Sequence, residues 1–198
     1  MRAGLLETWQ SSFWEVIQEP ATAGPLKDAS LRADRKAWTS LLTTAVVRSC
    51  EAIGLRAAGK GHRLDLLPQP GQEYLAIDVM AFPGTEPGDK CRWPQPVAAF
   101  ELENARKDDR VAYAFWKLLC VRVALRVLFA YRPDWENVRS LVGTFQDDVI
   151  GSLTIEQRTA LEGDTVVVMG SRGEGGTFPW GYFKVWKLDT NLGRFGKA

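Results

Sequence analysis

Three acidic residues in the middle of the chain have the side chains best suited to chemistry. Asp78 lies in the apolar stretch Tyr-Leu-Ala-Ile-Asp-Val-Met, and Glu101 and Glu103 flank Leu102 in a second apolar stretch. A carboxylate within an apolar strand is costly to desolvate unless it is paired or binds a cation. Glu101 and Glu103 are two residues apart, so on a strand both project from one face. Converging carboxylates predict a site for a hard divalent cation such as Mg²⁺ or Mn²⁺.

Hydrophobic periodicity predicts the elements that must position these acids. Helices are expected at residues 4–18, 34–53, from Asp108 or Asp109 onward, at 135–145 and after Thr154, which forms a capping box with Gln157. Strands are expected at residues 63–67, 73–82, 97–103, 125–131, 165–170 and 182–188. Pro20, Gly24 and Pro25 are expected to interrupt the chain after the first helix. The middle of the chain therefore orders as helix, three strands, helix and strand.

Length and composition indicate one packed domain, residues 1–198, without a strong electrostatic bias. The chain has 198 residues, of which 45% are hydrophobic, and its net charge is +1. The balanced charge does not favour a protein that coats nucleic acid through a general positive field, and local basic residues would have to bind any phosphate. Cys50, Cys91 and Cys120 have the spacing of neither a zinc clip nor a disulfide framework. The polar N-terminal stretch does not resemble a signal peptide, and no apolar run reaches ~18 residues, so a soluble cytoplasmic protein is expected.

The order of elements around the acids is that of a known family. With Ala76-Ile77-Asp78-Val79 on one strand and Ala99-Phe100-Glu101-Leu102-Glu103-Asn104 on the next, the chain resembles the PD-(D/E)XK nuclease superfamily over about residues 35–132. The resemblance implies an α/β fold with a restriction-endonuclease-like αβββαβ core, in which helices flank a mixed central sheet. The helix at 4–18 and an α+β extension at 133–198 complete the same domain.

The resemblance also implies a function, which is metal-dependent hydrolysis of DNA phosphodiester bonds by a restriction or defence endonuclease. Asp78, Glu101 and Glu103 would hold Mg²⁺ or Mn²⁺, which polarises the phosphate and lowers the pKa of the attacking water. Glu103 stands where most members have a lysine, and some restriction endonucleases also have a glutamate at that position. Lys107 and Lys117 of the following helix are candidates for the missing positive charge. Lys117 is expected to lie away from the apolar side of that helix, so Lys107 is preferred as the catalytic lysine.

Basic residues close to these acids in the sequence are candidates for phosphate contacts. They are Arg106 and Arg110 after the second acidic strand, and Lys90 and Arg92 in the preceding loop. The expected partner is DNA or another nucleic acid, and the expected assembly is a homodimer by analogy with restriction enzymes. Glu51, at the end of the helix 34–53, is interpreted as a surface charge.

Two other functions fit the same residues. A nuclease-like scaffold without catalysis, which binds nucleic acid or protein as a subunit, is favoured by the missing lysine and the balanced charge. The second of these functions is that of an enzyme that uses the same acids to hydrolyse a small phosphate ester. The acids could also lie on the solvated faces of half-exposed strands.

In the C-terminal part, the glycine-rich residues 171–176 are interpreted as a flexible hairpin loop.

Overall fold

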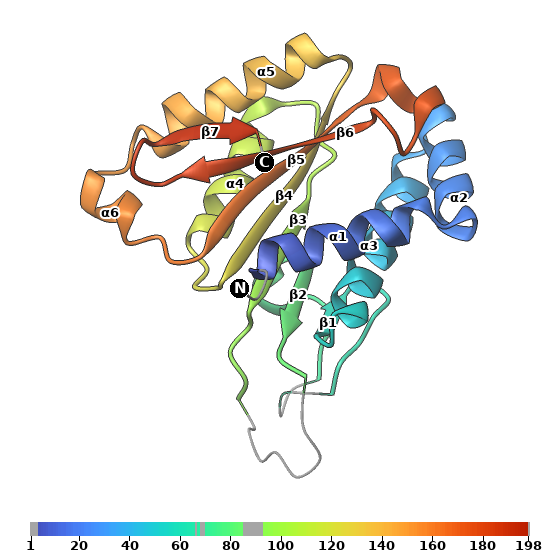
Figure 1. Ribbon diagram of the computed structural model, residues 1–198, viewed down its shortest axis with the longest axis horizontal. Coiled ribbons are helices and arrows are strands. Elements are labelled where there is room, and N and C mark those ends of the chain that lie inside the picture. Colours follow the sequence, from blue (N-terminus) through green and yellow to red (C-terminus); the bar gives the residue numbers. More distant parts are fainter. Residues whose placement is uncertain (1–3, 66, 68–69, 85–92, 198) are drawn as a thin grey trace. The chain divides into compact units, whose positions relative to one another are not determined.

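The chain divides into two compact units, Met1–Phe100 and Glu101–Ala198. The computed structural model describes residues 4–65, 67, 70–84 and 93–197 (Figure 1). Within these residues, no helix is both long enough and apolar enough to cross a membrane. Each unit has its own helices and strands, and each is described by itself.

Three helices make up the first half of the N-terminal unit: α1 (Leu5–Gln18), α2 (Pro20–Leu31) and α3 (Arg35–Ala52) (Figure 1). The expected helices at 4–18 and 34–53 are confirmed by α1 and α3. The expected break before Pro20 is confirmed, because α1 ends at Gln18 and Glu19 has a non-helical ψ of 131°. The expected interruption at Gly24 and Pro25 is wrong, because both residues lie within α2. Pro20 is the first residue of α2, where a helix needs no N–H donor, and buried Leu26 and Ala29 stabilise the turns around Pro25.

The strands of this unit differ from those expected before and at Asp78. β1 (Arg56–Gly59) pairs antiparallel with β2 (Val79–Phe82), and β2 pairs antiparallel with β3 (Ala98–Leu102), whose last two residues, Glu101 and Leu102, belong to the C-terminal unit. The strand expected at 63–67 is absent from the described residues there, which contribute only an isolated bridge between Leu64 and Gly71. The strand expected at 73–82 begins only at Val79, so Asp78 comes directly before a strand and not in the middle of one.

A 3-10 turn at Tyr74–Ala76 causes this shift of the strand. Leu75 and Ala76 both have positive φ, which an extended strand does not allow. The side chain of Leu75 is also 75% exposed, so the apolar alternation of this stretch does not correspond to burial. The Tyr74 hydroxyl fixes the turn instead, because it donates to the Leu64 carbonyl oxygen at 3.1 Å.

The C-terminal unit contains a mixed sheet. Its strands are β4 (Leu125–Arg132), β5 (Asp164–Ser171), β6 (Phe183–Asp189) and β7 (Arg194–Lys197). β4 and β5 are parallel, whereas β5 with β6 and β6 with β7 are antiparallel. The strands expected at 125–131, 165–170 and 182–188 are confirmed. β7 was not expected, since it is short and largely exposed and Phe195 is its only large apolar residue.

The helices of this unit are α4 (Asp108–Leu119), α5 (Trp135–Thr144) and α6 (Ile155–Thr159), and a π-helical segment, Phe145–Ile150, continues α5. α4 and α5 contact each other and both contact β4, so they cover one face of this sheet (Figure 1). Phe115 of α4 packs against Phe145, with ring centroids 5.0 Å apart. The capping box of Thr154 and Gln157 is confirmed. The molecule is thus an α/β protein with a mixed sheet flanked by helices, as expected.

Candidate functional site

A buried ion pair joins β3 to α4 in the C-terminal unit. The Nζ atom of Lys117 lies 2.8 Å from Oε1 of Glu101, and the two side chains are 24% and 6% exposed. A carboxylate this deeply buried is stable only with an opposite charge or hydrogen-bond donors beside it. The sequence predicted Glu101 on a strand, which β3 confirms, and expected a divalent metal ion to balance its charge, whereas here the ammonium group of Lys117 lies beside it.

Lys117 contacts Glu101, although its position away from the apolar side of the helix had made Lys107 the preferred lysine. Val111, Ala114, Phe115 and Leu118 are the buried residues of α4, and Lys117 lies beside this apolar stripe. A lysine in that position can lay its aliphatic stem along the helix and bring its amine to a group beyond the stripe. The helical periodicity located the Cα of Lys117 correctly but did not account for the length of its side chain.

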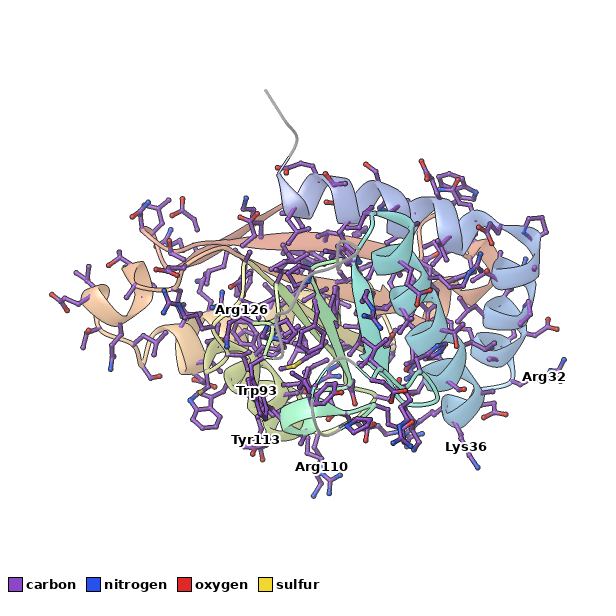
Figure 2. The ribbon with its side chains drawn as sticks, turned by 90° about the horizontal axis from the view of Figure 1, so that it is seen from below. Arg32, Lys36, Trp93, Arg110, Tyr113 and Arg126 are labelled. Atoms are coloured by element: carbon purple, nitrogen blue, oxygen red, sulfur yellow. The ribbon has the colours of Figure 1, made fainter. Side chains whose placement is uncertain are left out.

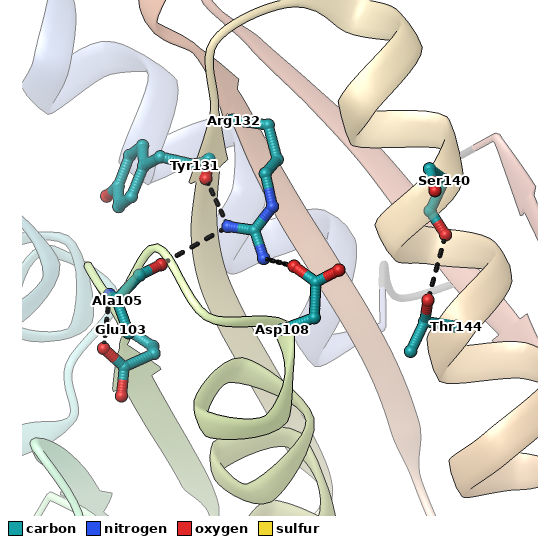
Figure 3. Close-up of polar contacts among 7 residues, drawn as sticks. All are labelled: Glu103, Ala105, Asp108, Tyr131, Arg132, Ser140 and Thr144. Atoms are coloured by element: carbon teal, nitrogen blue, oxygen red, sulfur yellow. Dashed lines mark hydrogen bonds and ion pairs between the residues drawn. The ribbon is translucent and has the colours of Figure 1, made fainter.

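Glu103 lies one residue beyond the end of β3 and is anchored through the backbone. Its N–H donates to the carbonyl oxygen of Phe129 on β4 at 2.9 Å, so this end of β3 lies beside β4. Its Oε1 accepts the N–H of Ala105 at 2.7 Å (Figure 3). The half-buried carboxylate thus stabilises the turn that leads from β3 to α4.

Arg132, which the sequence reasoning did not single out, holds the same turn from the end of β4. Its Nη1 donates to the carbonyl oxygens of Tyr131 at 2.6 Å and Ala105 at 3.4 Å, and its Nη2 pairs with the carboxylate of Asp108 (Figure 3). Arg132 is 7% exposed. An arginine that ends the buried strand Leu125–Arg132, directly after the apolar run Val127–Tyr131, is the signal that could have identified it. The helix expected from Asp108 or Asp109 onward begins at Asp108, and Lys107 occupies its N-cap position.

The segment 172–177 brings a second arginine to this turn. Nη2 of Arg172 donates to Oδ1 of Asn104 at 2.8 Å, and its guanidinium lies 5.3 Å from the ring centroid of Tyr131. The N–H of Gly173 donates to the carbonyl oxygen of Pro133 at 2.9 Å. The interpretation of this segment as a flexible hairpin loop is therefore wrong, because it forms 3-10 turns that are fixed to the ends of β3 and β4.

The remaining predicted site residues that the structure describes are exposed or belong to the N-terminal unit. Lys107 is exposed at the start of α4, and so are Arg106 and Arg110. Asp78, which is half-buried, and Glu51, which is exposed at the end of α3, belong to the N-terminal unit. Lys90 and Arg92 lie outside the described residues. The geometry thus favours Lys117 over Lys107 as the basic partner of the acidic strand.

The described residues contain no group of three or more histidine, cysteine, aspartate or glutamate side chains placed to hold one metal ion. Mg²⁺ does not require such a group, because it commonly keeps several waters and binds one or two carboxylates together with substrate phosphates. Glu101 and Glu103 offer hard oxygen donors of the kind that it prefers. The donor chemistry in the C-terminal unit therefore fits Mg²⁺ or Mn²⁺.

Comparisons with protein-family models, with curated proteins and with solved structures give no match for this chain. The resemblance to PD-(D/E)XK nucleases accordingly remains a prediction from the sequence motif and the order of elements. Any assignment of function rests on the side chains at the ends of β3, β4 and α4.

Proposed function

We propose that this protein is a Mg²⁺-dependent nuclease with a restriction-endonuclease-like core, in which Lys117 supplies the positive charge that Glu103 cannot. The ion pair between Glu101 and Lys117 carries the proposal. In the PD-(D/E)XK pattern, the lysine lies two residues after the acidic strand residue, and here an acid occupies that position. Lys117 reaches the same strand from α4, which restores a lysine beside Glu101, the acid of the (D/E)XK part of the motif.

The side chains of the C-terminal unit divide into those that would bind the cation and those that would act on the substrate. Glu101 and Glu103 would supply carboxylate oxygens to Mg²⁺ or Mn²⁺. When bound, the cation would polarise the scissile phosphate and lower the pKa of the attacking water. The ammonium group of Lys117 would lie close to the negative charge that develops on the phosphate oxygens, where a fixed cation is most effective. Arg132 would hold the turn that carries Glu103 in place.

Hydrolysis of nucleic acid by matched variants tests this proposal. The wild-type protein is incubated with plasmid DNA, single-stranded DNA and RNA in Mg²⁺ or Mn²⁺, beside Glu101→Gln and Lys117→Met. Both variants are expected to lower the cleavage rate by about 100-fold or more, the usual effect of removing a group that acts on the transition state.

The control is Lys187→Met, which removes the lysine of another ion pair in the same unit. The Nζ of Lys187 lies 2.7 Å from Oδ1 of Asp164, so the chemistry of the lost pair is the same. This variant is expected to cleave at the wild-type rate. Cleavage that persists in Glu101→Gln, or that falls equally in all three variants, contradicts the proposal.

A catalytically inactive nuclease-like scaffold is the second candidate, and the same ion pair favours it. Lys117 neutralises Glu101 within the protein itself, so the buried carboxylate does not depend on a metal ion. One oxygen of Glu103 is also engaged by the backbone N–H of Ala105. A scaffold of this kind would bind no Mn²⁺ in calorimetry and would cleave none of the substrates above. The nuclease would bind Mn²⁺ and cleave at least one of them.

A further inference from the structure

The outer face of α4 carries two exposed aromatic rings beside basic side chains. Tyr113 is 61% exposed and Trp116 is 48% exposed. Their ring centroids are 5.8 Å apart and their planes are inclined by 32°. The two rings are neighbours, and a large part of each remains in contact with water. Apolar rings that remain exposed in neighbouring positions commonly mark a surface for a partner.

Basic residues lie in the first turn of the same helix and directly before it. Arg110 is three residues before Tyr113, so the two side chains lie on neighbouring positions of the helix surface. Figure 2 shows Arg110 and Tyr113 projecting to the same side of α4. Arg106 and Lys107 precede the helix and are exposed. Within the described part of the chain, these three cations form neither an ion pair nor a side-chain hydrogen bond, so their charges are available to an anion.

The acidic residues at this end of α4 do not cancel that charge. Asp108 is paired with Arg132. Asp109 is exposed and is the other carboxylate of the first turn. Three cations and one carboxylate without a partner in the described chain leave this face positive, although the net charge of the whole chain is only +1.

We infer that this face of α4 binds a single-stranded segment of nucleic acid, with bases stacked on Tyr113 and Trp116 and phosphates contacted by Arg106, Lys107 and Arg110. Stacked rings with flanking cations are the common elements of single-strand binding surfaces, because every unpaired base offers a π face. In a duplex the base faces are covered by their neighbours, so the rings would contribute little. The inference rests on the proposed function in one respect, since it names the substrate class that Lys117, on the same helix, would act on.

The position of the face relative to the ion pair supports this substrate. Lys117 follows Trp116 directly and lies four residues after Tyr113, one turn along α4. A strand that stacks on the two rings would therefore pass within one helical turn of the lysine that contacts Glu101.

Binding is measured without cleavage, by fluorescence anisotropy of a labelled oligothymidylate of about 12 nucleotides in EDTA, a length within the usual site sizes. The wild-type protein is expected to bind this strand more tightly than a duplex of the same length. The double variant Tyr113→Ala/Trp116→Ala is expected to bind it at least about tenfold more weakly. Arg110→Ala is expected to weaken binding and to reduce its salt dependence by about one ion.

Two further variants separate stacking from loss of structure. Tyr113→Phe/Trp116→Phe keeps both rings and is expected to retain wild-type affinity within about threefold. Trp180→Ala removes another exposed tryptophan, 64% exposed in the same unit, and is expected to leave affinity unchanged. Equal binding by the alanine double variant and the wild type, or tighter binding of the duplex, overturns the inference. A change of oligomeric state in that variant with unchanged strand affinity also overturns it and assigns the rings to a protein interface.

Failure of this inference and failure of the nuclease proposal give different results. If cleavage requires Glu101 but the Tyr113→Ala/Trp116→Ala variant binds the single strand as tightly as the wild-type protein, only the inference about the single-strand surface is overturned. If binding of the single strand requires the two rings but the wild-type protein cleaves none of the substrates, only the nuclease proposal is overturned. Glu101→Gln is expected to abolish cleavage and still bind the strand in EDTA.

Discussion

The amine of Lys117 lies 2.8 Å from Oε1 of Glu101, and this contact fixes the last turn of α4 to the end of β3. Glu101 is the more deeply buried partner, with 6% of its side chain exposed against 24% for Lys117. The two residues therefore do not contribute equally to stability. An unpaired ammonium at the edge can reach water by extending its stem, whereas an unpaired carboxylate on the strand cannot.

The first prediction follows from this asymmetry. Lys117→Met is expected to lower the free energy of unfolding by about 2–4 kcal/mol, because it removes a cation from a buried carboxylate. Glu101→Gln is expected to cost about 1–2 kcal/mol, since the neutral amide needs no counter-charge. Urea denaturation of both single variants and of the double variant measures the two costs and the coupling between them.

The control for that cycle is the pair of Lys187 and Asp164, whose side chains are 42% and 30% exposed. Its coupling is expected to be less than about 1 kcal/mol, as for other solvated pairs. If the coupling between Glu101 and Lys117 is no larger than this, the pair is not acting as a buried one.

The second prediction concerns Arg132, which holds the turn between β3 and α4. Arg132→Lys is expected to destabilise the protein by about 2–3 kcal/mol, because a lysine cannot bond the Tyr131 and Ala105 carbonyls and Asp108 at the same time. Asp108→Asn is expected to cost less than about 1 kcal/mol, since the side chain of Asp108 is 51% exposed. Thermal and urea unfolding of the two variants compare them, and equal costs would show that the ion pair and not the backbone contacts is decisive.

Elements with strong hydrophobic periodicity could be predicted from the sequence. α1, α3, α4, β4, β5 and β6 all bury a regular stripe or a continuous apolar run, and their positions were expected within a few residues. The errors lie where local backbone chemistry overrides the pattern. Tyr74–Ala76 alternates like a strand but turns at two positive-φ residues, and Pro20–Leu31 contains two prolines but is helical because Leu26 and Ala29 are buried.

The candidate site was predictable as far as residue type and strand position determine it. A carboxylate within an apolar strand needs a partner, and the acids were therefore expected to bind a metal ion. The ammonium group of Lys117 beside Glu101 was not predicted, because helical periodicity gives the position of Lys117 on α4 but not the direction in which its side chain extends. Arg132 and Arg172 meet the turn after β3 from positions distant in the chain, and single-sequence periodicity carries no information about such contacts.

The third prediction concerns metal binding. Titration calorimetry with Mn²⁺ is expected to detect binding in the wild-type protein and at least about tenfold weaker binding in Glu101→Gln, because a neutral amide is a poor ligand for a hard cation. Glu103→Gln is expected to weaken binding as well, since Glu103 is the second carboxylate at this end of β3. Asp164→Asn, which removes a carboxylate on β5, is the control and is expected to leave the affinity unchanged. Equal heats from all four proteins would show that the acids at β3 do not bind the metal.

The fourth prediction concerns Cys50, a free thiol in α3 that is fully buried. Burial raises the pKa of this thiol well above its ordinary value of 9.0, and the neighbouring Glu51 adds to the effect. In the unfolded chain the thiol loses its proton first, so above about pH 9 the unfolded state binds fewer protons than the folded state. This contribution to stability is therefore fully present below that pH and is lost as the pH rises, by up to about 1.4 kcal/mol per pH unit.

The pH dependence is checked by urea unfolding between about pH 8 and pH 10.5, a range that brackets the ordinary thiol pKa, with the wild-type protein beside Cys50→Ala. Other groups titrate in the same range, so the difference between the two proteins is the informative quantity. The wild-type protein is expected to lose stability more steeply than the variant as the pH rises. Cys120, which is exposed, is expected to react with a thiol reagent in the folded protein, whereas Cys50 reacts only on unfolding. Parallel stability curves, or equal reactivity of the two thiols, would show that Cys50 is accessible to solvent in the folded state.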